Sequence, residues 1–241
     1  MKKIAAIAAF FSLVSTLSAQ EELRFGFQLS PTFSWMTTNT NQVNNSGTNL
    51  GLKMAMIGEF YFRENYAFTS GLGFAFNQGG TLLHELSGKY WPNSDLPIDT
   101  LPDGVKLKYK LQYLEIPLGL KMRTREFGYL RYYLEPALTL GFRTQSTGSV
   151  KGRNVGNDVE KINIKQEVNG LNLSWGVGGG IEYALSESTS LVTGLSFQVG
   201  IADVTDDNRN VVFNPDNQMF DRPENSAGRV HNITLRVAVM F

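Results

Sequence analysis

VHNITLRVAVMF, residues 230–241, is the stretch that decides the fold. Successive side chains of a β-strand point to opposite faces, so this stretch divides into two sides. The apolar side comprises Ile233, Leu235, Val237, Val239 and Phe241. The other side carries Asn232, Thr234 and Arg236. A strand of this kind is typical of an outer-membrane β-barrel, in which the apolar face meets lipid and the polar face lines the interior.

Earlier segments of the chain repeat this alternation. They cover residues 23–35, 50–62, 66–77, 109–122, 130–143, 171–184 and 191–202. One alternating segment is weak evidence, because strands of soluble sheets alternate as well. Eight in succession, each about 12 residues long, predict an all-β fold. We expect an eight-stranded antiparallel up-and-down transmembrane β-barrel.

The connections between the predicted strands alternate in length. The short ones are residues 63–65, 123–128 and 185–188, and the long ones are residues 36–49, 78–108, 144–170 and 203–229. Outer-membrane barrels have short periplasmic turns and long extracellular loops. With an even number of strands, both ends of the mature chain are expected on the periplasmic side of the bacterial outer membrane.

The N-terminus predicts export from the cytoplasm. A short basic start is followed by an apolar stretch, residues 4–17, and a small-residue cleavage site that ends at Ala19. An uncleaved N-terminal helix is the alternative, but the stretch is short for a stable membrane anchor. We therefore predict a signal peptide over residues 1–19 and an outer-membrane β-barrel domain over residues 20–241.

Composition excludes several other classes of protein. The chain has 22 Lys+Arg and 22 Asp+Glu, and loss of Lys2 and Lys3 with the signal peptide leaves 20 against 22. A mature chain with a slight acidic excess lacks the net positive charge that is typical of nucleic-acid-binding proteins. Beyond the signal peptide no run approaches the roughly 18 apolar residues of a membrane helix. The absence of cysteine excludes disulfides and a lipid anchor on cysteine.

The polar faces of the predicted strands predict a filled interior. A soluble barrel would turn these faces to water, but they are rich in glycine, and small residues mixed with a few long charged ones suit a narrow lumen. Buried charges must pair, so we predict a salt-bridged lumen network, and an ion path through the same charges is the alternative. The predicted network comprises Arg24, Lys53, Glu59, Glu115, Lys121, Arg131, Glu135, Arg143, Glu182 and Arg236.

Two local features add expectations. Pro117 and Pro136 fall in adjacent predicted strands, and proline cannot donate to the ladder of a closed barrel, so a bulge is expected there. Asp203, Asp206 and Asp207 follow the seventh predicted strand with a spacing unlike that of an EF-hand, so we interpret them as a solvated acidic loop.

Enzymatic and channel functions are the alternatives to a structural or interaction role. Some small outer-membrane barrels act on lipid or peptide, and such catalysis needs a histidine beside a serine or a carboxylate. The chain has two histidines, His84 in a predicted loop and His231 at the start of the last strand. A loop position and an interface position do not predict a dyad, so we expect no enzyme, no catalytic or metal site and no cofactor. A narrow porin-like channel is the other alternative.

One segment resembles a known family. The residues Tyr113, Leu114, Glu115, Ile116, Pro117 and Leu118 look like the hallmark segment of the PorT-type outer-membrane β-barrels of Bacteroidetes. The Ala19–Gln20 junction, the strand layout and the terminal Phe241 are also similar to that family, and Phe241 resembles the signal read by barrel-assembly machinery. The resemblance implies a porin-like outer-membrane barrel and, for some members, a role in type IX protein secretion. The expected partners are outer-membrane lipid, barrel-assembly machinery and envelope or secretion-system proteins.

Overall fold

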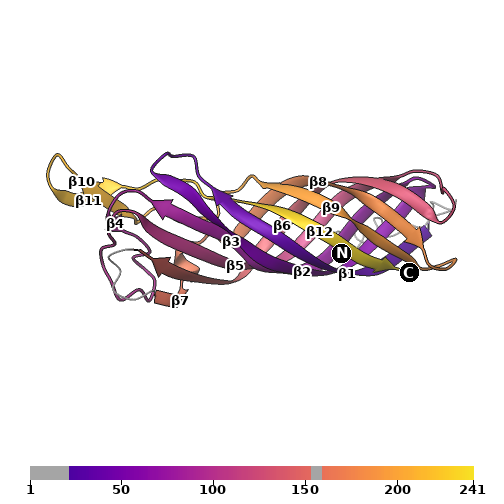
Figure 1. Ribbon diagram of the computed structural model, residues 1–241, viewed down its shortest axis with the longest axis horizontal. Coiled ribbons are helices and arrows are strands. Elements are labelled where there is room, and N and C mark those ends of the chain that lie inside the picture. Colours follow the sequence, from indigo (N-terminus) through magenta and orange to yellow (C-terminus); the bar gives the residue numbers. More distant parts are fainter. Residues whose placement is uncertain (1–21, 153–158) are drawn as a thin grey trace, which may run out of the picture.

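The computed structural model describes residues 22–152 and 159–241. The predicted signal peptide lies outside these residues. Eight long antiparallel strands form a closed ring in which each strand pairs with the next along the chain and the last pairs with the first (Figure 1). They are β1 (Glu22–Thr37), β2 (Val43–Arg63), β3 (Tyr66–His84), β5 (Val105–Arg123), β6 (Leu130–Lys151), β8 (Leu171–Ala184), β9 (Ser190–Gly200) and β12 (Arg229–Met240). The predicted eight-stranded up-and-down barrel is therefore confirmed.

The outer wall of the ring carries a belt of exposed apolar side chains. Every barrel strand contributes to this belt, for example through Phe27, Met56, Leu72, Leu118, Leu134, Trp175, Leu195 and Leu235. Exposure reaches 60% for Phe27 and 63% for Leu50. Soluble proteins rarely leave so large an apolar surface uncovered, so the belt needs an apolar surrounding. No helix in the described ranges is long and apolar enough to span a membrane.

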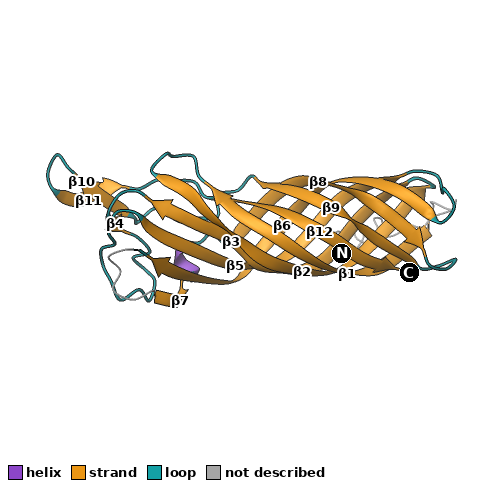
Figure 2. Ribbon diagram, in the orientation of Figure 1, coloured by secondary structure: helices purple, strands orange, loops and turns teal. Residues whose placement is uncertain are grey.

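Four barrel strands, β2, β3, β5 and β6, continue well beyond the belt at the end opposite the tight turns. Together with the connections at that end, their extensions form a second part of the molecule, which we call the head (Figures 1 and 2). The head also contains the short elements β4 (Gly88–Lys89), β7 (Val159–Asn163), η1 (Lys165–Glu167), β10 (Val211–Asn214) and β11 (Met219–Pro223). Strand β7 pairs with β6, whereas β4, β10 and β11 form a small separate sheet.

The head has a hydrophobic core of the kind found in soluble proteins. Its buried members include Met36, Val43, Leu82, Tyr90, Trp91, Leu101, Leu107, Tyr109, Leu111, Val150, Ile164, Val212 and Val230. Trp91 lies at its centre, where its indole Nε1 donates to the Tyr109 hydroxyl at 3.0 Å and its ring meets the Tyr109 ring edge-on at 5.1 Å. The core fills the space that the strand extensions enclose.

The head corrects the predicted strand ends. Residues 78–84, 105–108 and 144–151 were expected in loops, but they belong to β3, β5 and β6. The reason is a reversal of polarity along each strand. Within the belt the apolar side chains point outward, whereas in the head Leu107, Tyr109 and Leu111 point inward. Register shifts at Ala75–Gln78 and at Gln112–Tyr113 interrupt the alternation near the change.

The predicted bulge at the two prolines is wrong. Pro117 stands opposite Thr139 on β6, and Pro136 stands opposite Val177 on β8, with no register shift at either proline. In an antiparallel ladder each residue donates its N–H toward only one neighbouring strand. A proline therefore removes one hydrogen bond and leaves the opposite ladder in place.

Because Trp91 fills the centre of the head core, we expect Trp91→Ala to destabilise the head by about 3–5 kcal/mol. Limited proteolysis of the purified protein in detergent should show faster cleavage in the head while the belt stays protected. Trp175→Ala is the matched control, because Trp175 lies on the belt and is 52% exposed. Equal protection of the head in both variants would contradict the assigned core.

Candidate functional site

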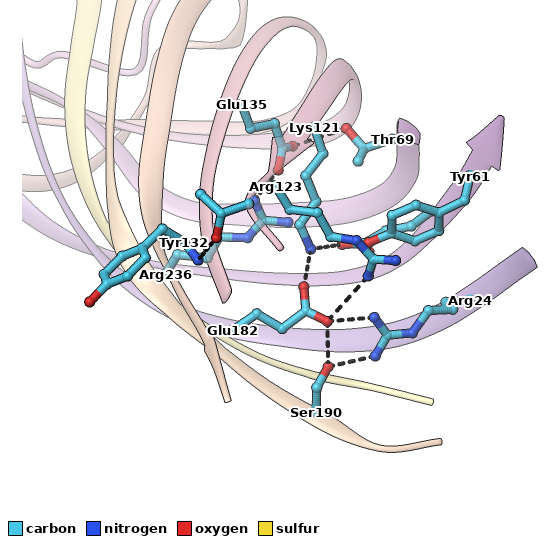
Figure 3. Close-up of polar contacts among 12 residues, drawn as sticks. Arg24, Tyr61, Thr69, Lys121, Arg123, Tyr132, Glu135, Glu182, Ser190 and Arg236 are labelled. Carbon is cyan, nitrogen blue, oxygen red and sulfur yellow. Dashed lines mark hydrogen bonds and ion pairs between the residues drawn. The ribbon is translucent and has the colours of Figure 1, made fainter. Parts of the chain in front are cut away.

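Inside the belt, the lumen nearest the tight turns holds a buried ion cluster (Figure 3). The ammonium of Lys121 lies 2.7 Å from Glu59 Oε1 and 2.9 Å from Glu182 Oε2, and all three side chains are at most 2% exposed. Arg24 donates to Glu182 Oε1 at 2.5 Å and to the Ser190 hydroxyl at 2.5 Å. These residues come from strands β1, β2, β5, β8 and β9, so the cluster ties together strands on different sides of the ring.

Two residues of this cluster were not predicted from the sequence. The Tyr61 hydroxyl donates to Glu59 Oε2 at 2.7 Å. The guanidinium of Arg123 stacks on the Tyr61 ring at 3.9 Å from its centroid and lies 3.8 Å from Glu182 Oε1. Arg123 was assigned to a turn, but it is the last residue of β5. Its odd-numbered position, two residues after Lys121, is the sequence signal that it points inward.

The middle of the lumen holds a second ion pair. Arg236 donates through Nη1 to Glu135 Oε2, and the Thr69 hydroxyl donates to Glu135 Oε1 at 3.0 Å. The ring of Tyr133 lies between the two clusters, 5.5 Å from the Arg236 guanidinium and 5.2 Å from Lys121 Nζ. This aromatic ring gives both cations a favourable neighbour in a space with little water.

A third group lies nearer the head. Lys53 Nζ is 3.0 Å from Glu115 Oε2 and donates to Gln198 Oε1 at 2.7 Å. The Gln198 amide in turn donates to the Thr139 hydroxyl at 2.9 Å. A cavity of about 90 Å³ remains beside these groups, bordered also by Pro117. It leaves room for a few water molecules.

The lumen of the described chain therefore contains a nearly balanced set of charges. It has five cations, which are Arg24, Lys53, Lys121, Arg123 and Arg236, and four carboxylates, which are Glu59, Glu115, Glu135 and Glu182. The three groups follow one another from the tight turns toward the head, and the head core covers their outer end. These ion pairs link the barrel strands to one another, and their side chains fill the lumen.

Two predicted members lie outside this network, Arg131 near the start of β6 and Arg143 in its interior, next to a register shift. Arg131 pairs with Glu126 at 2.6 Å beside a tight turn, and its side chain is 32% exposed. Arg143 donates to the backbone carbonyls of Lys165 and Val168 in the head. Both predictions were wrong because each arginine lies beyond the level of the lumen carboxylates. Arg131 is beside a tight turn that supplies Glu126, and Arg143 is at the level where the head begins and the carbonyls of Lys165 and Val168 are its partners.

The two histidines lie apart in the structure. His84, at the end of β3, is 2% exposed and packs against the Tyr90 ring at 4.2 Å, and burial lowers its pKa to about 3. His231, in β12, shares a hydrogen bond of 2.7 Å between Nε2 and the Thr37 hydroxyl and stacks with Trp35. Neither ring nitrogen of His84 has a hydrogen-bond partner among the described residues, and the contact of His231 with the Thr37 hydroxyl includes no carboxylate that would orient the imidazole as a base.

The predicted solvated acidic loop is only partly solvated, because Asp203 is exposed whereas Asp206 and Asp207 are half-buried. Burial, together with the neighbouring carboxylates of Glu224 and Asp203, raises the pKa of Asp207 to about 8. Its carboxylate accepts hydrogen bonds from Thr205 and Ser226. These residues close the base of the β10–β11 region, so they act as structural polar contacts of the head. Among the described residues no group of three or more His, Cys, Asp or Glu side chains could hold a metal ion.

Comparison with known proteins places the chain among outer-membrane barrels. The model of a family described as outer membrane protein beta-barrel domain matches residues 18–206. No curated protein matches the sequence.

Several solved structures are similar in outline. Neisserial surface protein A is 12% identical, with 92% of this chain and 98% of that chain covered and a TM-score of 0.45. The attachment invasion locus protein Ail of Yersinia pestis is 8% identical, with 92% and 100% covered and a TM-score of 0.40. The outer membrane protease OmpT of Escherichia coli is 8% identical, with 93% and 98% covered and a TM-score of 0.39.

Removal of one partner of a buried pair should be more damaging than removal of an exposed one. We expect Arg236→Met to destabilise the barrel by about 3–5 kcal/mol, because it leaves Glu135 buried and unpaired. Arg236→Met combined with Glu135→Gln should recover most of this loss. Arg131→Met is the control for an exposed pair, with an expected loss of about 0–1 kcal/mol. Urea unfolding in detergent, followed by tryptophan fluorescence, measures all three, and equal losses for Arg236→Met and Arg131→Met would contradict the assignment.

Proposed function

The chain belongs to the outer membrane protein beta-barrel domain family, and we propose that it works as a closed barrel that presents its head to other molecules of the cell envelope. It is a bacterial outer-membrane protein in which the apolar belt faces lipid. The proposed role is structural, as an interaction component, and not enzymatic.

One observation carries this proposal: the interior is occupied along its length. The lumen holds three groups of charged side chains, and the head core with Trp91 and Tyr109 covers their outer end. An eight-stranded barrel has space for side chains and little else. We therefore expect no continuous path for solutes past these groups, which leaves the exposed surface of the head as the part available for function.

We propose that the head faces the cell exterior and that both termini of the mature chain face the periplasm. Short turns join β2 to β3, β5 to β6 and β8 to β9 at one end, and the long connections form the head at the other. Outer-membrane barrels place short turns on the periplasmic side. The terminal Phe241 lies at the short-turn end, 56% exposed, where periplasmic barrel-assembly machinery could read it.

The finer proposal is a PorT-type barrel that takes part in type IX secretion, and it rests on the resemblance of residues 113–118. In the structure Leu114, Ile116 and Leu118 alternate with the inward Glu115, which pairs with Lys53. The segment thus spans the transition from head core to lumen. Envelope or secretion-system proteins would bind the head or the periplasmic turns, since the wall between them is covered by lipid.

A filled lumen predicts the absence of a pore. The purified protein, reconstituted in planar lipid bilayers, should give no stable open conductance, whereas a general porin reconstituted in the same way gives one. A stable open pore of the wild-type chain would overturn the closed-barrel proposal.

Deletion of the gene tests the secretion role. If the protein serves secretion, the deletion strain should lose a subset of the proteins that the parent releases into the medium. The full-length gene should restore them. The β10–β11 hairpin, residues 211–223, projects farthest from the barrel in Figure 1. A variant in which a short Gly-Ser linker replaces this hairpin distinguishes a contact made by the head from a contact made by the periplasmic turns. An unchanged set of released proteins after deletion would remove the secretion role.

A further inference from the structure

The outer face of one head strand carries a row of lysines. Because Leu107, Tyr109 and Leu111 of β5 point into the head core, the residues between them point outward. These residues are Lys106, Lys108 and Lys110, which we call the basic row. Lys106 is exposed and the other two are partly exposed.

The basic row has no acidic counterpart on its neighbouring strands. None of the ion pairs in residues 22–152 and 159–241 includes any of its lysines. On the β6 side, Lys151 stands opposite Lys106, and Thr147 stands opposite Lys110. On the β3 side, the partners are Leu83, Thr81 and Gly79.

This arrangement is electrostatically unfavourable by itself. Successive lysines on one face of a strand are roughly 7 Å apart, so the like charges of the row repel one another. An anion with several charged groups at similar spacing would relieve this repulsion. Phosphate groups are suitable because the lysine ammonium is a compact, strongly hydrated charge that binds phosphate as a point charge.

The position of the row indicates where that anion lies. On the outward face of β5, Lys110 is followed by Gln112 and then by Leu114, where the belt begins. Four residues span roughly 13 Å of strand, and a strand tilt of about 45° reduces this to roughly 9 Å of height above the belt. Lys110 therefore stands near the level of lipid headgroups. Lys108 and Lys106 lie progressively farther out, because they precede Lys110 along β5, which runs from the head into the barrel (Figure 1).

We propose that the basic row binds the phosphate groups of a glycolipid in the leaflet that surrounds the head end of the barrel. This inference rests on the proposed orientation, with the head outside. The lipid is favoured over a soluble polyanion because the row continues the lipid-facing wall of β5. A lipid whose acyl chains lie against Leu114 and Leu118 brings its phosphates to this height.

The test is binding of a phosphate-bearing glycolipid to the purified full-length protein in detergent, measured by native mass spectrometry across a range of salt concentrations. The triple variant Lys106→Gln, Lys108→Gln, Lys110→Gln should bind about tenfold more weakly or worse and show a shallower dependence on salt. The matched control removes three other exposed charges of the head, through Lys89→Gln, Lys165→Gln and Arg222→Gln. It should bind within about twofold of the wild type.

Three results would overturn the proposal. They are equal loss of binding in both triple variants, unchanged binding when the glycolipid is first dephosphorylated, and equally tight binding of soluble inorganic polyphosphate, which would assign the row to a soluble polyanion. Heat-modifiable migration on gels confirms that each variant is folded.

A separate measurement tests the orientation on which the inference rests. The chain has no cysteine, so a single Asn217→Cys at the tip of the β10–β11 hairpin can be labelled selectively with a membrane-impermeant maleimide on intact cells. Labelling supports an external head. Absence of labelling would overturn the orientation even if the purified protein binds the glycolipid, so the two failures are distinguishable.

Discussion

The pairing of β12 with β1 is the interaction on which the rest of the structure depends. Their register runs from Gly26 opposite Met240 to Thr37 opposite Arg229. Beyond it, the backbone N–H of Phe241 donates to the carbonyl of Phe25 at 2.7 Å. Lipid offers no hydrogen bonds, so every backbone group inside a bilayer needs a partner within the protein. Closure of the ring provides these partners and at the same time fixes which face of each strand is enclosed.

Each strand that continues into the head passes through two different surroundings, lipid around the belt and water around the head, and its enclosed face differs between the two. Within the belt, lipid lies outside, so the apolar side chains of β5 point outward and Glu115 and Lys121 point inward, where they pair. Above the belt, water lies outside, so Leu107 and Tyr109 turn inward and Lys108 turns outward. The same strand thus carries a membrane-protein pattern in one half and a soluble-protein pattern in the other. This reversal closes the lumen and leaves the basic row on the outer surface.

Small residues on the enclosed face make the packing of the lumen possible. A Cβ at Gly194 would lie 2.6 Å from the Tyr133 hydroxyl and 2.3 Å from the Gly179 carbonyl oxygen. A Cβ at Gly180 would lie 2.0 Å from the carbonyl oxygen of Thr193. Gly194 thus gives Tyr133 the space to lie between Lys121 and Arg236, and Gly180 allows β8 and β9 to approach each other closely. On β8 and β9, the glycines of the polar face are therefore explained by close approach of the two strands beside a large aromatic ring.

The sequence by itself determined the ring of strands. Apolar and polar residues alternate along residues 230–241 and along the other segments, and this alternation specified the strands that span the belt. It could be recognised because a two-residue period is a local property of the chain. It also indicated which charges point inward, such as Lys121 and Glu182. Tertiary structure alone decided the partners, since the stagger of the closed sheet brings Arg236 to Glu135 and Arg24 to Glu182 across strands far apart in sequence. It also placed Arg123 in the lumen and Arg131 and Arg143 outside it. The head was not predicted from the sequence, because the inward-facing side chains are apolar in the head and polar in the belt. The position along each strand at which this change occurs depends on where the surrounding lipid ends. Trp91 reaches the head core from a connecting segment with no period of its own, so only the folded chain shows what it contacts.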